Sequence, residues 1–150
     1  MANPIHTVFT GIWTLLDGHA GLDSPVIIHS YKFDSIEEVP PEDPNVSQLP
    51  DLTVVFTGGP VHNIDTNLGP WFSVLGYSII ARTDSMKIQT AMDICWEILD
   101  AITASNTNHN LNMTGTVTHC EIVNVDVTMN DEASRWQVQV DLSVHLATNP

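Results

Sequence analysis

Basic residues are scarce in this sequence. Four lysines and arginines stand against 18 aspartates and glutamates, which gives a formal net charge of −14. Binding of nucleic acids through their phosphates needs lysine and arginine, so this charge disfavours direct binding of DNA or RNA. The negative charge is compatible with a surface past which DNA slides, because such a surface repels the DNA and does not retain it. The composition leaves open whether the acidity serves such a purpose or only solubility.

Long apolar runs and cysteine pairs are also lacking. The 150 residues contain no run of 18 apolar residues, and the segment 1–4 is not a basic stretch followed by an apolar one. We therefore expect neither a membrane span nor a secretory signal. Cys95 and Cys120 match no CxxC pattern, and Cys95 falls on the apolar side of a predicted helix, where a buried side chain is expected. The seven histidines form no HExxH motif, so no metal or cofactor is predicted.

Apolar residues recur at helical spacing in two segments. The first predicted helix runs from Ile5 to Leu16, with Gly18 placed to end it. The second spans residues 85–103, and its apolar face is expected to contain Ile88, Ala91, Met92, Cys95, Leu99 and Ile102.

The opposite face of the second helix carries three carboxylates, Asp93, Glu97 and Asp100. Carboxylates at such spacing can bind a metal or share a proton. No basic or histidine residue lies alongside them in the sequence, which favours a solvated face.

The remaining patterned segments predict strands at 26–31, 52–56, 72–82, around Val123, Val125 and Val127, and at 136–146. In the last of these, apolar and polar residues alternate without interruption, which indicates one dry and one wet face. Residues 32–50 combine four prolines with five carboxylates and are expected to form a long acidic loop. We therefore predict a single α+β domain, 1–150, with a mostly antiparallel sheet, two main helices on one face, and the order α-β-β-β-α-β-β.

Motifs typical of enzymes are absent as well. The sequence contains no G-x-S-x-G elbow, no glycine-rich phosphate loop and no diagnostic grouping of Ser, His and Asp. Other subunits can instead dock on the polar face of the predicted sheet, on the acidic loop and on the long final strand. These features predict a protein that assembles rather than an enzyme.

The order of elements resembles that of the tail-terminator (tail-completion) proteins of long-tailed bacteriophages. The opening helix Ile5–Leu16, the central helix 85–103 directly after strand 72–82, and the closing strand 135–142 carry the likeness. It implies a homohexameric virion ring in the tail or neck, assembled in the host cytoplasm. Such a ring ends the tail tube and joins it to the head connector, while DNA passes through its centre without specific binding.

This resemblance also suggests where the surfaces lie. Candidate residues for the lumen or ring face are Asp93, Glu97 and Asp100, and candidates for contacts with other subunits or the neck are Glu37, Glu38, Glu42, Asp43 and Trp71. Two alternatives stay open. One is another ring of the virion, such as a head–tail adaptor or a tube-related protein. The other is a small acidic domain that binds a ligand or metal through His62, His109, His119 or the acidic helix face.

Overall fold

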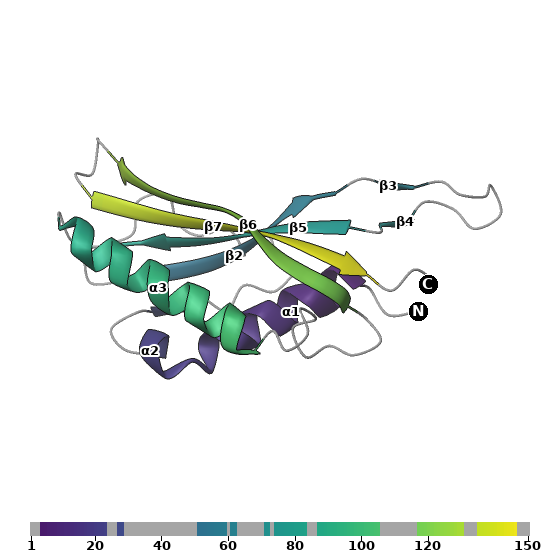
Figure 1. Ribbon diagram of the computed structural model, residues 1–150, viewed down its shortest axis with the longest axis horizontal. Helices are drawn as coiled ribbons and strands as arrows, with labels where there is room; N and C mark the ends of the chain where they lie inside the picture. Colours follow the sequence, from purple (N-terminus) through teal and green to yellow (C-terminus); the bar gives the residue numbers. More distant parts are fainter. Residues whose placement is uncertain are drawn as a thin grey trace.

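The computed structural model describes residues 4–23, 27–28, 51–59, 61–62, 71–72, 74–83, 87–105, 117–130 and 135–146. Three helices and seven strands lie in these ranges (Figure 1). They are α1 (Pro4–Asp17), α2 (Ala20–Asp23), β1 (Ile27–Ile28), β2 (Asp51–Gly58), β3 (Val61–His62), β4 (Trp71–Phe72), β5 (Val74–Arg82), α3 (Ile88–Ser105), β6 (Val117–Asn130) and β7 (Arg135–Leu146).

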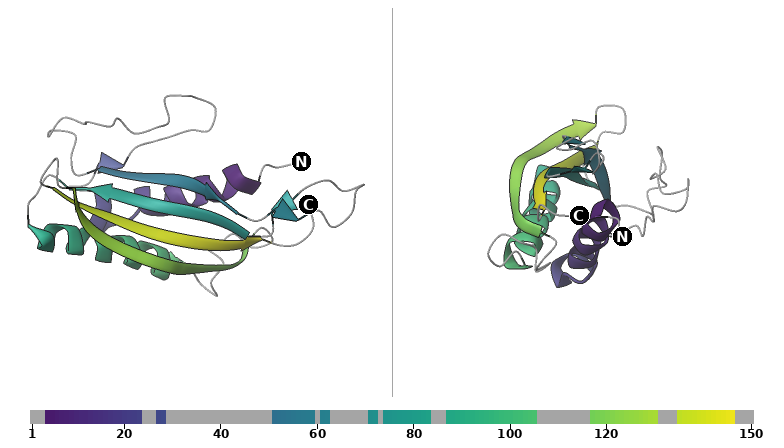
Figure 2. Two further views of the ribbon diagram at one scale, coloured as in Figure 1. Left: turned by 90° about the horizontal axis from the view of Figure 1, so that it is seen from above. Right: turned by 90° about the vertical axis from the view of Figure 1, so that its right-hand side faces the viewer.

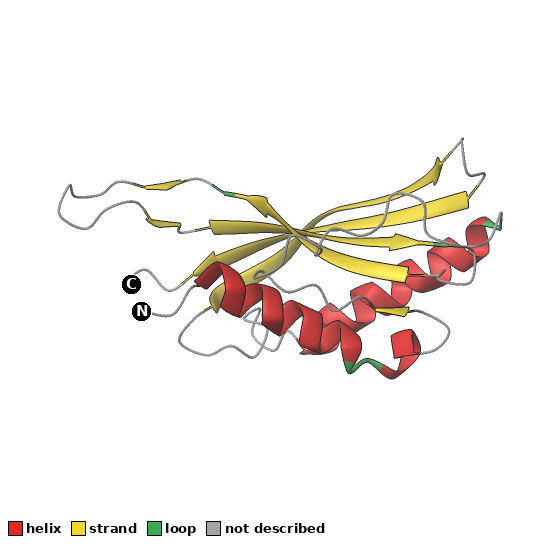
Figure 3. Ribbon diagram, turned by 180° about the vertical axis from the view of Figure 1, so that it is seen from behind, coloured by secondary structure: helices red, strands yellow, loops and turns green. Residues whose placement is uncertain are grey.

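The main sheet has five strands in the order β1-β2-β5-β7-β6. All neighbours are antiparallel except β1 and β2, which are parallel. The helices α1 and α3 lie on one face of this sheet, and no described helix covers the other face (Figure 2 and Figure 3). This arrangement confirms the predicted α+β fold class with a mostly antiparallel sheet.

Strand β7 explains why the sheet has a dry and a wet face. It lies between β5 and β6, with Val140 opposite Ile79 on one side and Val125 on the other. Its alternate side chains are buried from Val138 to Leu146, as the alternation in the sequence predicts. The dry face packs on the helices, and the core between them is almost entirely aliphatic.

The first helix is confirmed nearly to the residue. Its stripe of Val8, Phe9, Ile12 and Leu16 is buried. The buried hydroxyl of Tyr77 on β5 donates a hydrogen bond of 2.6 Å to the carbonyl of Ile5. This bond fixes the first turn of α1 against the sheet.

The predicted apolar face of the second helix is partly wrong. The buried side chains of α3 are Ala91, Ile94, Cys95, Ile98, Ala101 and Ile102. By contrast, Ile88 is 47% exposed and Met92 is 53% exposed. The segment has apolar residues around most of its circumference, so periodicity alone does not determine which of them face the sheet. Packing against β7 and α1 selects the side centred on Ile98.

Two predicted strands also differ in detail. The segment 72–82 is divided between β4, which pairs with β3, and β5, which belongs to the main sheet. In β6 the pairing shifts between Ile122 and Asn124, so Val123 leaves the regular pattern and is 63% exposed, while Val125 and Val127 face Val140 and Val138. Of the predicted strand 26–31, β1 covers two residues; the remainder and the loop 32–50 lie outside the described residues.

Candidate functional site

Large apolar side chains are exposed along one edge of the molecule. Within the described residues, six such side chains are exposed, and all come from α3 or β6. They are Ile88, Met92 and Trp96 on α3, and Ile122, Val123 and Val125 on β6, and we call this set the apolar flank. Both views in Figure 2 place α3 and β6 on the same side of the sheet. Where exposed apolar side chains gather in one contiguous patch, they mark a surface for another molecule, so the apolar flank is a candidate for such a surface.

The side chains on α3 show how the apolar flank arises. Ile88, Met92 and Trp96 follow each other at intervals of four residues, so they form one stripe along the helix. Trp96 is 67% exposed, the largest fraction in the flank. Trp96 and Glu97 point about 100° apart around the helix, because an α-helix turns 3.6 residues per turn. Glu97 therefore lies on a different side of the helix from the apolar stripe.

Strand β6 adds backbone to this surface. It has 14 residues, lies at one edge of the main sheet, and pairs with β7 alone among the described strands. An edge strand of this length offers unpaired N–H and C=O groups to another chain, unless bulges or charges prevent pairing. The pairing shifts twice, between Val117 and His119 and between Ile122 and Asn124, which limits the stretch over which an added strand could pair regularly.

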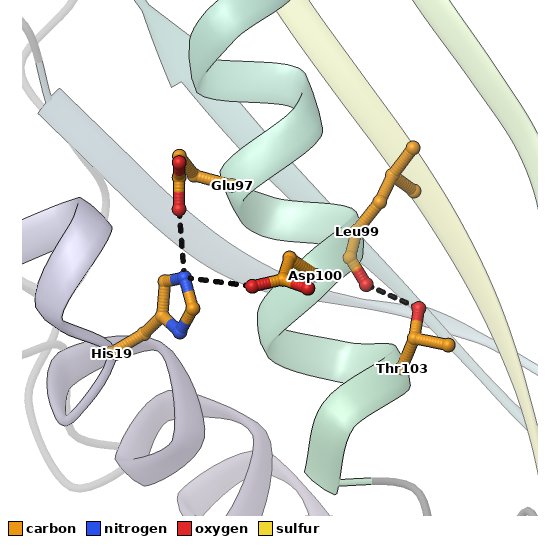
Figure 4. Close-up of polar contacts among 5 residues, drawn as sticks. All are labelled: His19, Glu97, Leu99, Asp100 and Thr103. Atoms are coloured by element: carbon orange, nitrogen blue, oxygen red, sulfur yellow. Dashed lines mark hydrogen bonds and ion pairs between the residues drawn. The ribbon is translucent and has the colours of Figure 1, made fainter.

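Two of the acidic residues of α3, Glu97 and Asp100, contact a histidine that the sequence does not predict as their partner. His19 lies between α1 and α2, and its Nε2 is 2.8 Å from Oε2 of Glu97 and 3.6 Å from Oδ2 of Asp100 (Figure 4). The expectation that these carboxylates have no histidine partner is therefore wrong. His19 is 78 residues from Glu97 in the chain, and the contact depends on how α2 packs on α3.

Local structure places His19 in this position. Helix α1 closes with a bond of 3.0 Å from the Gly18 N–H to the Thr14 carbonyl, and the His19 N–H donates to Leu16. The chain then turns into α2, which Leu22 anchors in the core with no exposed surface. Gly21 lies against the Glu97 side chain so closely that a Cβ atom would collide with the carboxylate. The ring of His19 is held half-buried between the two carboxylates as a result.

The third predicted acidic residue of α3 stands apart. Asp93 is exposed, and it is not one of the three residues whose ligand atoms cluster, which are His19, Glu97 and Asp100. Of the predicted contact residues, Trp71 belongs to β4, which pairs with β3 through His62. The candidates Glu37, Glu38, Glu42 and Asp43, together with His109, lie outside the described residues.

The face of the sheet opposite α1 and α3 carries a polar network centred on Asp141. Its carboxylate accepts hydrogen bonds of 2.5 Å from Ser78 and 3.0 Å from Gln139. The bonds from Ser78, then Gln139 and Asn124, lower the pKa of Asp141 in spite of partial burial. These bonds thus favour the ionised carboxylate of Asp141 on the face of the sheet opposite α1 and α3.

A second group of ionisable side chains lies on the same face, beside the C-terminal end of β7. His119 and His145 are cross-strand partners with ring centroids 5.4 Å apart. Each Nε2 is 3.7 Å from an oxygen of Glu121, and all three side chains are 40% exposed or more. The exposure of His145 confirms its predicted place on the wet side of the last strand.

The cysteines offer no reactive group. Both are buried and neither is in a disulfide, and the burial of Cys95 confirms the expectation for it. Burial raises the pKa of Cys95, and burial together with neighbouring Glu121 raises that of Cys120 to about 12. Neither thiol is ionised at neutral pH.

Comparison with known proteins gives one kind of match. No family model matches the sequence, and no curated protein matches it. Among solved structures, a chain of the virion of a native gene transfer agent (GTA) particle has a similar fold, with a TM-score of 0.59 and 14% sequence identity. The match covers 93% of each chain, so the likeness extends over the whole fold. Within the described residues, none of the helices has the length and apolar character needed to cross a membrane.

Proposed function

We propose that this chain is a structural protein of a phage-like virion, and that it forms a ring which ends the tail tube and joins it to the head connector. The observation that carries the proposal is the fold likeness to a chain of a gene transfer agent virion, over 93% of both chains. One fold can host many functions, so the proposed role also depends on the surfaces of this chain.

The apolar flank supports assembly. A ring forms when one surface patch meets a different patch on the next copy and the rotation closes. Trp96 and Met92 are of the residue types that are enriched in interface cores, and both are exposed in the single chain. We propose that the apolar flank of one subunit is covered by the next subunit of the ring.

The acidic surface supports passage of DNA. A lumen lined by carboxylates repels a polyanion, so DNA is not retained there. Asp93, Glu97 and Asp100 remain our candidates for the lumen or ring face, and Asp93 is the one that lies outside the cluster around His19. We propose further that Glu37, Glu38, Glu42, Asp43 and Trp71 contact neighbouring subunits or neck proteins, and that the chain is not an enzyme.

The oligomeric state tests this proposal. We expect sedimentation velocity to give a discrete species near six copies, or a monomer that converts to it at high concentration, and negative-stain images to show rings. Addition of the purified chain to polymerising tail-tube protein is expected to stop tube growth. A chain that remains monomeric at every concentration would contradict the proposal. Rings that leave tube growth unchanged would favour a head–tail adaptor instead.

The lumen assignment needs a separate test. Asp93→Lys reverses an exposed charge of α3, and Asp17→Lys on α1 is a matched reversal at an exposed carboxylate outside the apolar flank. Both variants are expected to fold and to form rings. If Asp93 lines the channel, particles with Asp93→Lys lose infectivity and those with Asp17→Lys keep it. Equal infectivity of both would remove Asp93 from the lumen.

A further inference from the structure

We infer that His19, Glu97 and Asp100 form a binding site for one divalent transition-metal ion, of which zinc is the best match. The three side chains come from the α1–α2 connection and from α3, and their ligand atoms all lie within 4.8 Å of one another. The site is contained in one chain, so it goes beyond the proposed ring and does not depend on it.

The distances suit such an ion. Zinc binds imidazole nitrogen and carboxylate oxygen at about 2.0–2.2 Å, so two ligands in a tetrahedral site are roughly 3.4 Å apart. The separation of 3.6 Å between His19 and Asp100 is already close to this value. The pair His19 and Glu97, at 2.8 Å, has to open by about 0.6 Å to reach this value, and the pair Glu97 and Asp100 lies within 4.8 Å.

The chemistry of the donors selects the class of ion. Calcium and magnesium prefer sites made of oxygen alone, whereas imidazole suits zinc and its neighbours in the first transition row. Two carboxylates beside one imidazole give a site with net negative charge in a chain of net charge −14, which favours a dication. Three protein ligands leave a fourth position for water or for a group from another molecule.

The surroundings hold these ligands in place without a metal. Leu22 fixes α2 in the core, and Ile98 and Ala101 fix the same turns of α3 from their buried side. Because Gly21 has no side chain, the Glu97 carboxylate can lie directly against its backbone. A bound ion would cross-link the α1–α2 connection to α3 and so stabilise the folded chain.

Calorimetric titration of the EDTA-treated chain with zinc tests the site. We expect one zinc ion per chain at this site, a visible spectrum of bound cobalt, and no binding of magnesium. Asp100→Asn and His19→Gln should each weaken zinc binding at least about tenfold, whereas Asp93→Asn, on the same helix, should leave it unchanged. Zinc at a hundred times its dissociation constant should raise the melting temperature of the wild type by roughly 5 °C or more, and that of Asp100→Asn by much less.

Two further variants keep the result unambiguous. Glu121→Gln removes the carboxylate shared by His119 and His145, so binding that survives in this variant does not come from that group. Gly21→Ala keeps all three ligands but displaces Glu97, and it should weaken binding as well. Zinc binding that is lost in Glu121→Gln, or that is equally tight in wild type and Asp100→Asn, would overturn the inference. In that case the contacts of His19 with the two carboxylates serve only to pack the α1–α2 connection on α3.

Discussion

Replacement of Trp96 by alanine should weaken assembly without weakening the fold. The side chain is 67% exposed in the single chain. A tryptophan offers about 250 Å² of surface, so roughly 170 Å² is open to a partner. At about 25 cal/mol per Å², complete burial of that area contributes at most about 4 kcal/mol to each subunit contact. Loss of this amount raises the dissociation constant of one contact by up to about a thousandfold.

Sedimentation velocity over a wide concentration range measures this effect. The control variant is Thr10→Ala, which removes an exposed side chain from α1 and leaves α3 unchanged. We expect Trp96→Ala to remain monomeric at concentrations where the wild type and Thr10→Ala form the larger species. Thermal unfolding of the monomers should agree within about 0.5 kcal/mol, because an exposed side chain adds little to the stability of a single chain.

Two results would refute this reasoning. If Trp96→Ala assembles at the same concentration as the wild type, the apolar flank is not the contact between subunits. If the variant unfolds as a monomer well below the wild-type temperature, Trp96 stabilises the fold of the single chain. Its exposure then does not indicate a contact between subunits.

Three further predictions concern the sheet. Leu142→Ala should lower the free energy of unfolding by roughly 2–5 kcal/mol because Leu142 is 2% exposed, whereas Val123→Ala, at 63% exposed, should change it little in urea titrations. The pKa of Asp141 is lowered in the fold, so its hydrogen bonds stabilise the chain above pH 4 and this contribution disappears as the pH falls through the lowered pKa. The gap in unfolding free energy between wild type and Asp141→Asn should therefore be larger at pH 7 than at pH 2.5. With its pKa at about 12, the Cys120 thiol should react with a thiol reagent at pH 8 only once urea unfolds the chain; fast labelling of the native chain would contradict this burial.

The parts of the fold that the sequence predicts well are those in which one pattern has one solution. In β7, strict alternation leaves a single way to bury Val138 and Val140. Helix α1 has one apolar stripe, and Ile12 lies in the middle of it. Each of these elements contributes a face that must be buried somewhere, so local periodicity is sufficient to identify it.

The errors fall where a pattern has two solutions or depends on a distant residue. Helix α3 has more apolar residues than the sheet can cover, so the choice between Met92 and Ile98 is made by packing. The shift of pairing at Val123 reverses which side chains of β6 face inward, and no periodicity predicts it. The contact of His19 with Glu97 joins residues 78 positions apart, and the only local signal for it is a histidine directly after the end of a helix.

Helix α3 connects the fold to the proposed function. One side of it is buried around Ile98, a second carries the acids that His19 contacts, and a third presents Ile88, Met92 and Trp96. The first two sides have partners within the chain, whereas the third gains little from exposure to water, since each of its side chains would release free energy on burial. An exposed stripe beside an edge strand is the arrangement expected where a partner covers both elements at once. In the proposed ring a second copy of the chain would be that partner, so disruption at Trp96 tests the proposed function more directly than any change in the core.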